Sequence, residues 1–430
     1  MSHAPGGGLL EPLRHKGFAL LWGGFIASHV GDFVQILAQS WLVVDLTRSA
    51  TKVAAVAFAQ AIPRFFVTLL AGVVVDRTDR RRLLLVTQSL AAAQSAVFLA
   101  LVLSHRITYA WVLGLSFALG FLDALNLTAR QAVMPSLVPR ELLPRAIALQ
   151  ALGVNITQIA GPSLGGVLLA TLGVQGCLAF NVVSFAVLVG TIFIARIPSP
   201  ATDPSSRRHW TEDLREGVAY LRGRRVLWVP LLLAYAMGLF GMPVVRLLPL
   251  FARAVLHVEE GGFGALAAAT GVGAIVASLA VTARARARDL PRNILRAGVV
   301  FALAVLAFAW SDRVPWAFAA LMVFGGAQMA FRSAIMTVFQ TEVPDRLRGR
   351  VISVLGIDFA LWSVGGVAVG ALGDALARAH GGAPEAATAW GLHAAITAAG
   401  LLCLATITLS RNALRATEGE LSAGTPPGAG

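Results

Sequence analysis

A few ionisable residues stand inside long apolar runs of this chain, and the first two of them lie at matching depths. Asp32 lies about 15 residues into the run 17–45, which is roughly 22 Å along a helix. Arg64 lies about 12 residues from the end of the run 52–75, which is roughly 18 Å. A charge inside a membrane is costly and usually faces a cavity, where a carboxylate can take up and release a proton. We therefore expect Asp32 and Arg64 to interact, either in function or as a static ion pair of a helix bundle.

Polar residues around Asp32 share one face of the expected helix. Ser28, Asp32, Gln35 and Gln39 follow the spacing i, i+4, i+7 and i+11, which places side chains on one side of a helix. We expect this face to line a cavity and to contact a substrate. His29 stands next to it, and its position favours a packed residue over a proton relay.

Further ionisable residues lie in later apolar runs. Arg332 and Asp358 have similar depths, so we expect them to pair, again either as a static bridge or as a functional site. Asp123 is a third candidate for proton coupling, beside Asp32 and Asp358, and Asn126 is a candidate substrate contact. Arg246 either draws an anionic substrate or turns its charged head toward the membrane surface.

Composition places these residues in a protein that crosses a membrane many times. The 430-residue chain is 57% hydrophobic and only 13% charged, with a mean hydropathy of +0.74, whereas soluble domains carry about 25% charged residues. The net charge of +13 does not indicate nucleic-acid binding, because the basic residues occupy alternate loops rather than one face of one domain. No phosphate-binding loop, paired-histidine motif or nucleophile elbow occurs, so we expect no enzyme, no cofactor and no metal site.

Twelve apolar segments are long enough to cross about 30 Å of hydrocarbon. If the N-terminus lies inside, the inner loops and tails hold 25 Lys and Arg residues and the outer loops hold 5. Positive charge stays on the cytoplasmic side, so this bias predicts a multi-pass protein of the cytoplasmic membrane with both ends in the cytoplasm. The segments are 17–45, 52–75, 83–103, 109–136, 146–171, 175–195, 227–252, 262–283, 293–310, 315–341, 351–376 and 388–409.

The segments fall into two halves separated by the longest polar stretch. Arg130–Met134 matches Arg332–Met336, and related halves of this kind are typical of transporters that move about a central site. The predicted fold is therefore all-α, with twelve transmembrane helices in two pseudo-symmetric six-helix bundles. The expected parts are a cytoplasmic tail at 1–16, a bundle at 17–196, a linker with an amphipathic helix at 197–225, a second bundle at 226–411 and a cytoplasmic tail at 412–430.

A charged turn between the second and third segments carries a recognisable motif. Gly72, Asp76 and Arg80 are one helical turn apart, and Arg77 follows the acid. This pattern resembles the loop 2–3 signature of the major facilitator superfamily. The resemblance implies a conformational latch: the glycine allows close packing with helix eleven, Asp76 caps that helix, and Arg80 pairs with an acid of helix four, for which Asp123 is available.

The fifth segment carries a second motif. Gly153, Gly161 and Gly165 lie on one stripe that lets another helix approach closely, and Pro162 favours a bend. Together with Gly166 the pattern resembles the helix-five signature of the exporter branch of the superfamily, the drug:proton antiporter type. We expect the close partner to be the eighth segment.

Short motifs narrow the resemblance to the enterobactin-exporter-like group over about residues 10–410. They are Gly31–Asp32, Ala61–Arg64, Ala129–Ala132 and Arg348–Val351. The resemblance implies a monomeric secondary transporter that exports a small amphipathic molecule, a drug or a siderophore-like compound, by proton antiport with alternating access. Its partners would be the substrate, protons and the lipid bilayer, and no nucleic acid. The alternatives are an uncoupled facilitator or lipid-moving transporter of the same fold, and a non-transporting membrane sensor or assembly protein.

Overall fold

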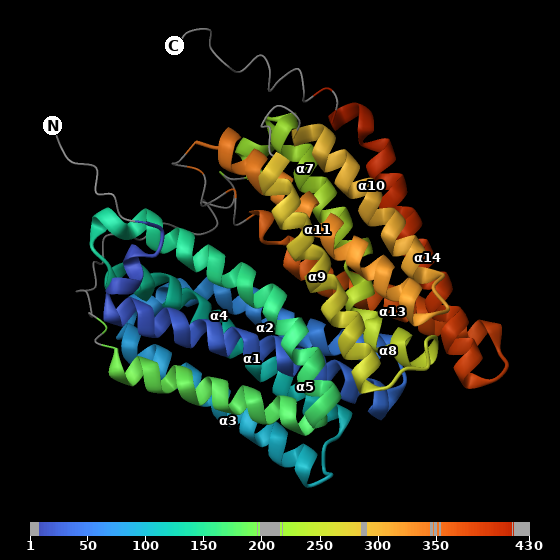
Figure 1. Cartoon of the computed structure of the whole chain (residues 1–430), viewed down its shortest axis with the longest axis horizontal. Coiled ribbons are helices and arrows are strands. Elements are labelled where there is room, and N and C mark those ends of the chain that lie inside the picture. Colours follow the sequence, from blue (N-terminus) through green and yellow to red (C-terminus); the bar gives the residue numbers. More distant parts are fainter. Residues whose placement is uncertain are drawn as a thin grey trace. The chain divides into compact units, whose positions relative to one another are not determined.

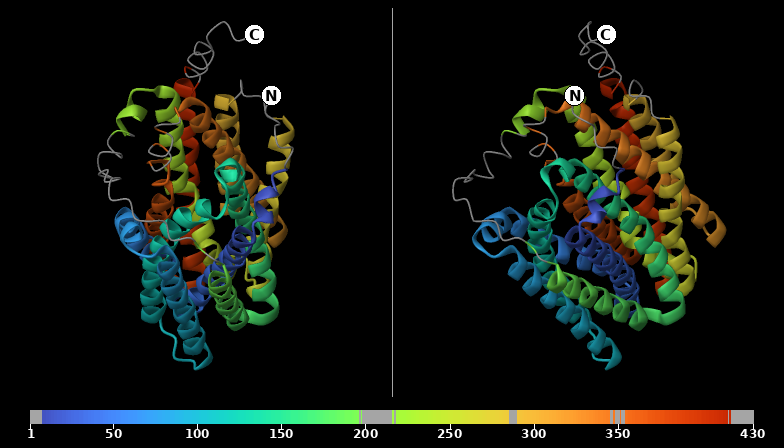
Figure 2. Two further views of the ribbon diagram at one scale, coloured as in Figure 1. Left: turned by 90° about the vertical axis from the view of Figure 1, so that its left-hand side faces the viewer. Right: turned by 60° about the vertical axis from the view of Figure 1, so that its left-hand side comes forward.

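The computed structural model describes residues 8–195, 197, 216, 218–284, 290–344, 347, 351, 354–414 and 416. Within these ranges the side chains of 68–74, 76, 77, 155, 159, 279–284 and 359 are not described. The elements of the described part are helices, with no strand among them, as the labelled view and two further views show (Figures 1 and 2). The all-α prediction is therefore confirmed.

The chain divides into two compact units. Unit 1 holds residues 1–42 and 59–206, and unit 2 holds residues 43–58 and 207–430. The end of the first helix and the start of the second thus group with the C-terminal half. The predicted division into two bundles at the linker 197–225 stays a prediction.

Unit 1 is built from long helices joined by short turns. Asp79 accepts a hydrogen bond from the Arg82 amide at 2.7 Å and Thr108 accepts from the Trp111 amide at 3.4 Å, so each caps the start of a helix. The long helices are α1 (Lys16–Thr47), α2 (Ala50–Arg77), α3 (Arg80–Leu103), α4 (Tyr109–Val133) and α5 (Leu143–Ile194), and the 3-10 turns are η1 (Glu11–Arg14), η2 (Met134–Leu137) and η3 (Arg140–Leu142).

Helix α5 contains two membrane crossings. Its 52 residues would extend about 78 Å if straight, more than twice the hydrocarbon thickness. Gly173 reverses the chain with φ 64° and ψ −170°, a conformation that favours glycine. The second half returns along the first, because the Cys177 thiol lies 4.0 Å from the Gly165 carbonyl oxygen. Eleven described helices are long and apolar enough to span, and counting α5 twice confirms the twelve predicted crossings.

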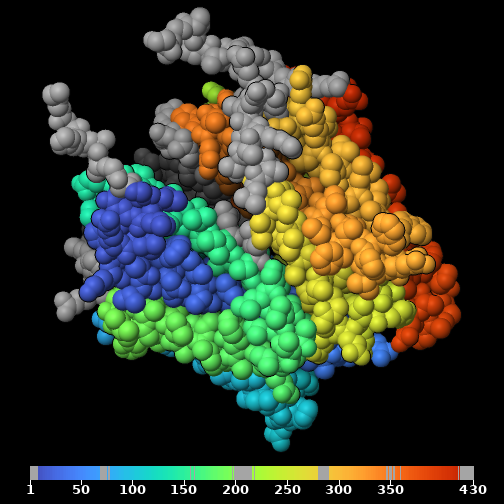
Figure 3. Space-filling model, in the orientation of Figure 1, coloured from blue at the N-terminus to red at the C-terminus, as the bar shows by residue number. Residues whose placement is uncertain are grey.

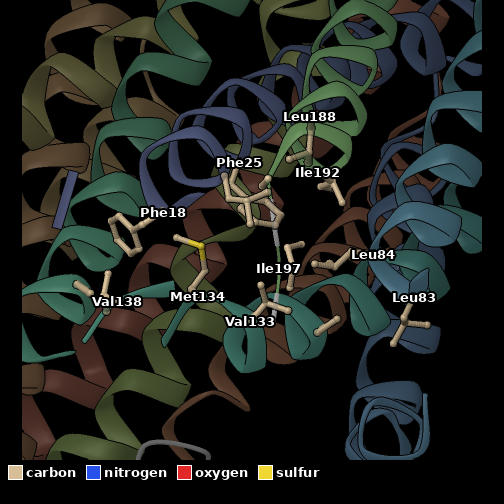
Figure 4. Packing of buried hydrophobic residues seen from close by; sticks show 14 of the residues in the cluster. Phe18, Phe25, Leu83, Leu84, Val133, Met134, Val138, Leu188, Ile192 and Ile197 are labelled. Atoms are coloured by element: carbon tan, nitrogen blue, oxygen red, sulfur yellow. The ribbon is translucent and has the colours of Figure 1, made fainter. Parts of the chain in front are cut away.

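The largest apolar core of unit 1 joins four helices at one end of the unit. Phe18 and Phe25 come from α1, Leu84 from α3, Met134 from the end of α4 and Leu188 from α5, and all are buried. Figure 4 shows these side chains converging from the separate helices. The core fixes the ends of these helices, so the charged residues farther along them hold defined positions.

Unit 2 contains one helix with a break that the sequence did not predict. The span Arg225–Ala254 consists of α7 (Arg225–Ala236), a π turn called η4 (Met237–Gly241) and α8 (Pro243–Ala254). Pro243 begins α8 at a position where its missing amide costs no helical hydrogen bond. Such π turns are frequent at functional sites. The other helices are α9 (Glu260–Arg284), α10 (Leu290–Ala309), α11 (Val314–Glu342), α13 (Asp358–His380) and α14 (Pro384–Leu409).

The start of α2 is held in unit 2 by one carboxylate. Asp374 in α13 accepts hydrogen bonds from the Ser49 hydroxyl at 2.6 Å and from the amides of Ala50 and Thr51 at 3.0 Å each. These amides are free at a helix N-terminus, where a negative charge is also favoured by the helix dipole. Asp45 adds a 3.7 Å ion pair to Arg253. These contacts explain why residues 43–58 belong to unit 2.

Candidate functional site

The first acid of unit 1 has an incompletely satisfied carboxylate. The Asp32 Oδ2 atom lies 3.3 Å from the Nδ1 atom of His29, one helical turn earlier in α1. The other oxygen, Oδ1, is buried and has no hydrogen-bond partner among the described residues. A buried charged oxygen without a partner is unfavourable, and it offers a place for a proton.

The second acid of unit 1 stands on α4. The Gln60 side chain in α2 donates a hydrogen bond to Asp123 Oδ2 at 3.2 Å. Gly120, one turn earlier on α4, faces the backbone carbonyl of Gln60 so closely that a Cβ atom would collide with it. The glycine thus brings the two helices together where the acid needs its amide partner.

These two acids belong to one cluster of charges. Asp123 lies within electrostatic reach of Asp32, Arg64 and His29. Arg130 lies about two turns after Asp123 on α4. It is within electrostatic reach of both acids and of Arg64. We call these five residues the unit 1 charge cluster. Two acids and two arginines balance each other, so one added proton changes the net charge of the cluster.

Arg130 also has an aromatic contact that fixes its position. Its guanidinium lies 5.2 Å from the centroid of the Phe25 ring in α1, within the range of a cation–π interaction. The expected Asp32–Arg64 contact stays a prediction, but both residues share Asp123 and Arg130 as electrostatic neighbours.

The polar residues that share the helix face with Asp32 lie inside unit 1. Ser28, Gln35 and Gln39 are 4%, 1% and 6% exposed. The side-chain oxygen Oε1 of Gln35 accepts hydrogen bonds from the Ser95 hydroxyl at 2.9 Å and from the Asn181 side-chain amide at 2.8 Å. In this conformation all three side chains are buried, and Gln35 ties α1 to α3 and α5. Helical spacing predicted that they share a face, but not which way that face turns, and their contact with substrate stays a prediction.

Gln39 and Asn126 make similar ties between helices. The Gln39 amide donates to the Ser116 hydroxyl in α4 at 2.7 Å. The Thr87 hydroxyl in α3 donates to the Asn126 side chain, which is buried. Both residues therefore stabilise the bundle in this conformation, and a substrate contact by either one remains untested.

The expected partner of Arg80 in the latch differs in the structure. The Arg80 guanidinium donates to the Ala132 carbonyl at 3.3 Å. Ala132 is about nine residues, roughly 13 Å, along α4 from Asp123. Asp123 instead belongs to the charge cluster, so the sequence assigned the right helix but the wrong level on it. The side chains of Gly72, Asp76 and Arg77 lie outside the described residues.

The glycine stripe of the fifth segment packs on α1. A Cβ at Gly161 would lie 2.5 Å from the Cβ of Phe33, and one at Gly165 would lie 3.2 Å from the Cα of Val34. Gly153 faces Trp22, whose indole donates to the Leu149 carbonyl at 3.0 Å. Within unit 1 these three glycines therefore face α1, and the expected contact with the eighth segment stays a prediction.

The other members of the helix-five motif accompany this contact. Pro162 lies inside α5, and Gly166 is buried beside it. The close packing positions α1, which carries Asp32, against the first half of α5.

The expected charged pair of unit 2 is present. Arg332 in α11 lies 3.3 Å from Asp358 Oδ2, and its guanidinium stands over the Trp362 ring at 5.5 Å. Asp358 is 6% exposed, and its Oδ1 atom has no hydrogen-bond partner among the described residues. Gly238 in the π turn faces that oxygen, and a Cβ there would collide with it.

A small cavity adjoins this pair. Its volume is about 40 Å³, and Arg332, Asp358 and Trp362 line it together with Gln328, Met242 and Phe301. A water molecule needs roughly 10–15 Å³ of such space, so two or three waters fit beside the orphan carboxylate oxygen. The Gln328 amide does not donate to the carboxylate, because it is directed at the Met242 sulfur at 3.1 Å.

Arg246 lies elsewhere in unit 2. It is half-buried, and its aliphatic carbons pack beside Gly366 of α13. The structure thus shows a packed stem, and its expected attraction of an anionic substrate stays untested.

Comparison with known proteins decides the family. A family model described as transmembrane secretion effector matches residues 7–426. The chain belongs to this family of major facilitator superfamily transporters. The chain is thus a multi-pass membrane transporter for small molecules and not an enzyme.

Two curated relatives and one solved structure illustrate the similarity. The multidrug efflux pump Tap of Mycolicibacterium fortuitum is 27% identical over 83% of this chain and 88% of its own length. The staphyloferrin A transporter of Staphylococcus aureus is 22% identical over 80% of this chain and 86% of its own. The inward-facing, unoccupied structure of a bacterial homolog of the human lysosomal transporter Spinster aligns with a TM-score of 0.73 and 17% identity, covering 97% of this chain and 100% of that one.

Sequence reasoning did not assign three members of these charged sites. Gln60 carries no signal of its own, because its importance comes from facing Asp123 across the helices. Arg130 was visible as a charge inside an apolar segment, but its electrostatic contact with both acids depends on packing. His29 was visible three residues before Asp32, and that spacing places two side chains on the same helix face. Spacing therefore favoured a contact that the sequence interpretation had put aside.

Proposed function

We propose that this transporter exports a small amphipathic molecule across the cytoplasmic membrane in exchange for protons. The observation that carries the proposal is the unit 1 charge cluster, in which Asp32 and Asp123 share one electrostatic neighbourhood with two arginines. Two acids in one membrane-embedded neighbourhood favour binding of a proton to one of them. The likeness to a multidrug efflux pump and to a siderophore transporter supports the direction and the class of cargo.

In this mechanism Asp32 is the proton acceptor and Asp123 is its electrostatic partner. The unpartnered Oδ1 of Asp32 receives the proton, which removes one negative charge and leaves the cluster with a net positive charge. The changed balance favours the orientation of the helical units that releases the proton inward, and substrate binding favours the other. The coupling is the difference in free energy between these orientations.

The proposal includes the membrane and the orientation. Both chain ends lie in the cytoplasm, because 25 Lys and Arg residues fall in the inner loops and tails and 5 in the outer loops. The transporter acts as a monomer, since each chain carries the acids and arginines of the cluster.

The test uses Asp32→Asn in proteoliposomes with an imposed proton gradient and a fluorescent amphipathic cation as cargo. The variant keeps the shape of the side chain but carries no exchangeable charge, so the gradient should no longer drive accumulation. Coupling free energies of about 1–3 kcal/mol correspond to a loss of roughly 5–150-fold in the substrate ratio reached.

The matched control is Glu385→Gln, which removes one carboxylate from an exposed ion pair with Arg48 far from the cluster in sequence. It should keep full proton-driven transport. Undiminished gradient-driven accumulation by Asp32→Asn sinks the proposal. Accumulation by the unaltered protein that a protonophore does not change would instead support an uncoupled facilitator.

A further inference from the structure

A groove on the surface of unit 2 lies between α10 and α11. Its volume is about 680 Å³, within the range of pockets that hold small organic ligands. Figure 3 shows the face of the molecule on which these two helices lie, coloured gold to orange. The groove walls are mostly apolar, and their larger members are Val300, Leu303, Ala307, Trp310, Trp316 and Val323.

The groove has the length of one lipid leaflet. Val300 lines it about nine residues before the end of α10, which is roughly 13 Å along the helix, and Trp310 and Ser311 extend the lining just past that end. Half of a hydrocarbon core of about 30 Å is 15 Å. The groove therefore runs from the end of the helix to about the middle of the membrane, the depth reached by one acyl chain.

Two tryptophans flank the end of the groove at the turn between the helices. Trp310 and Trp316 are 66% and 68% exposed. The Trp310 ring is not free to turn, because it stacks on His393 of α14 with ring centroids 5.7 Å apart. Tryptophan gathers at the level of lipid headgroups, so this end lies at the membrane surface.

Opposite charges stand side by side at that same end. Asp312 and Arg313 line the groove, are exposed, and form no ion pair within the described part of the chain. An acidic and a basic group in adjacent positions complement a headgroup that carries one charge of each sign. A purely anionic headgroup would satisfy the arginine but meet repulsion from the aspartate.

We propose that this groove binds a zwitterionic phospholipid. One acyl chain lies along the apolar walls between α10 and α11, the headgroup amine faces Asp312, and the phosphate is bound by Arg313. The inference does not depend on the proposed export function, since it involves neither the charge cluster nor the Arg332–Asp358 pair.

The test measures lipid retention by native mass spectrometry. The purified full chain is incubated with equal amounts of dioleoyl phosphatidylethanolamine and dioleoyl phosphatidylglycerol in mixed micelles. We expect the zwitterionic lipid to be retained preferentially. Asp312→Asn should reduce that preference by about tenfold, the effect of one charge-assisted hydrogen bond. Arg313→Gln should lower the retention of both lipids by a similar factor, because both carry the phosphate.

Two further variants separate the site from general lipid contact. Ala307→Trp places a large ring in the middle of the groove, so it should lower retention without altering the headgroup charges. Arg378→Gln removes an exposed arginine near the end of α13 and should change nothing. Equal retention of the two lipids by the unaltered chain, unchanged preference in Asp312→Asn, or unchanged retention of both lipids by Arg313→Gln overturns the proposal.

Discussion

Unit 1 and unit 2 each contain an aspartate with one buried, unpartnered oxygen, yet they surround it differently. Asp32 in unit 1 shares its neighbourhood with a second acid, two arginines and a histidine from three helices. Asp358 in unit 2 has one arginine at 3.3 Å and faces a small cavity of about 40 Å³. The first site has several groups that can exchange partners when a proton arrives. The second is a matched pair of one acid and one arginine, in which loss of either charge leaves a net charge at the site.

The largest effect on stability is expected from breaking the matched pair. Asp358→Asn removes the acid that pairs with Arg332, and breaking a buried pair costs about 3–5 kcal/mol. Because 35% of the Arg332 side chain is exposed, we expect a smaller loss of about 2–4 kcal/mol. Thermal unfolding in detergent measures it.

The double variant Arg332→Gln with Asp358→Asn is the control for that measurement. It removes both charges, so most of the lost stability should return. A double variant as unstable as Asp358→Asn alone would show that the pair is not the source of the effect.

The next effect separates the two sites by transport. Asp123→Asn removes a charge from the cluster and should lower the proton-driven substrate ratio by roughly 5–150-fold, the usual range of coupling. The neutral double variant of unit 2 should retain proton dependence, since its pair carries no net charge. Loss of proton dependence in both variants would erase the distinction between the units.

A third acid, Asp374, tests whether hydrogen-bond donors to the carboxylate decide if an acid takes part in proton coupling. Asp374 has hydrogen-bond donors for both of its oxygens, supplied by Ser49, Ala50 and Thr51. It should act only in structure. Asp374→Ala should lower the free energy of unfolding by about 2–3 kcal/mol, the cost of a lost hydrogen bond to a charged group, while Asp374→Asn should lose less.

Transport by Asp374→Asn is the informative readout beside its unfolding curve. We expect its proton dependence to equal that of the unaltered chain. A proton-insensitive Asp374→Asn would place this acid with Asp32 instead of with the structural contacts.

The smallest effect is expected at Gln60. Gln60→Leu removes the hydrogen bond to Asp123 and should destabilise the protein by about 1–2 kcal/mol, because the carboxylate loses a donor. The same variant should shift the pH at which transport is half-maximal, since the charged form of Asp123 is less well held. A pH profile and an unfolding curve that both match the unaltered chain would remove Gln60 from the site.

The sequence predicted the crossings and the depth of the charged residues. The length of the apolar segments and the distribution of arginine among the loops determine the crossings. The position of a charged residue within a crossing follows from counting along that one segment. Arg332 and Asp358 were expected to pair because their positions within their segments match, and the structure places them 3.3 Å apart. The family motif in the fifth segment likewise indicated a close helix contact that the structure contains.

Side-chain direction and the choice of partner helix could not be predicted in the same way. Gln35 shares a helix face with Asp32 but bonds to Asn181, far along the chain. The glycines of α5 indicated a close approach without saying which helix approaches. Three-dimensional packing decides both, and the π turn beside Asp358 depends equally on contacts outside its own residues.

The reversal at Gly173 has a consequence for how the protein is made. Residues 143–194 form a hairpin whose two arms touch and whose turn contains a single residue of positive φ. No polar loop separates the arms, so this stretch enters the membrane as one paired unit, with its backbone hydrogen bonds satisfied within the arms. A replacement at Gly173 would then act during synthesis, by disfavouring the turn that closes the pair, and would reduce the yield of inserted protein rather than its rate of transport.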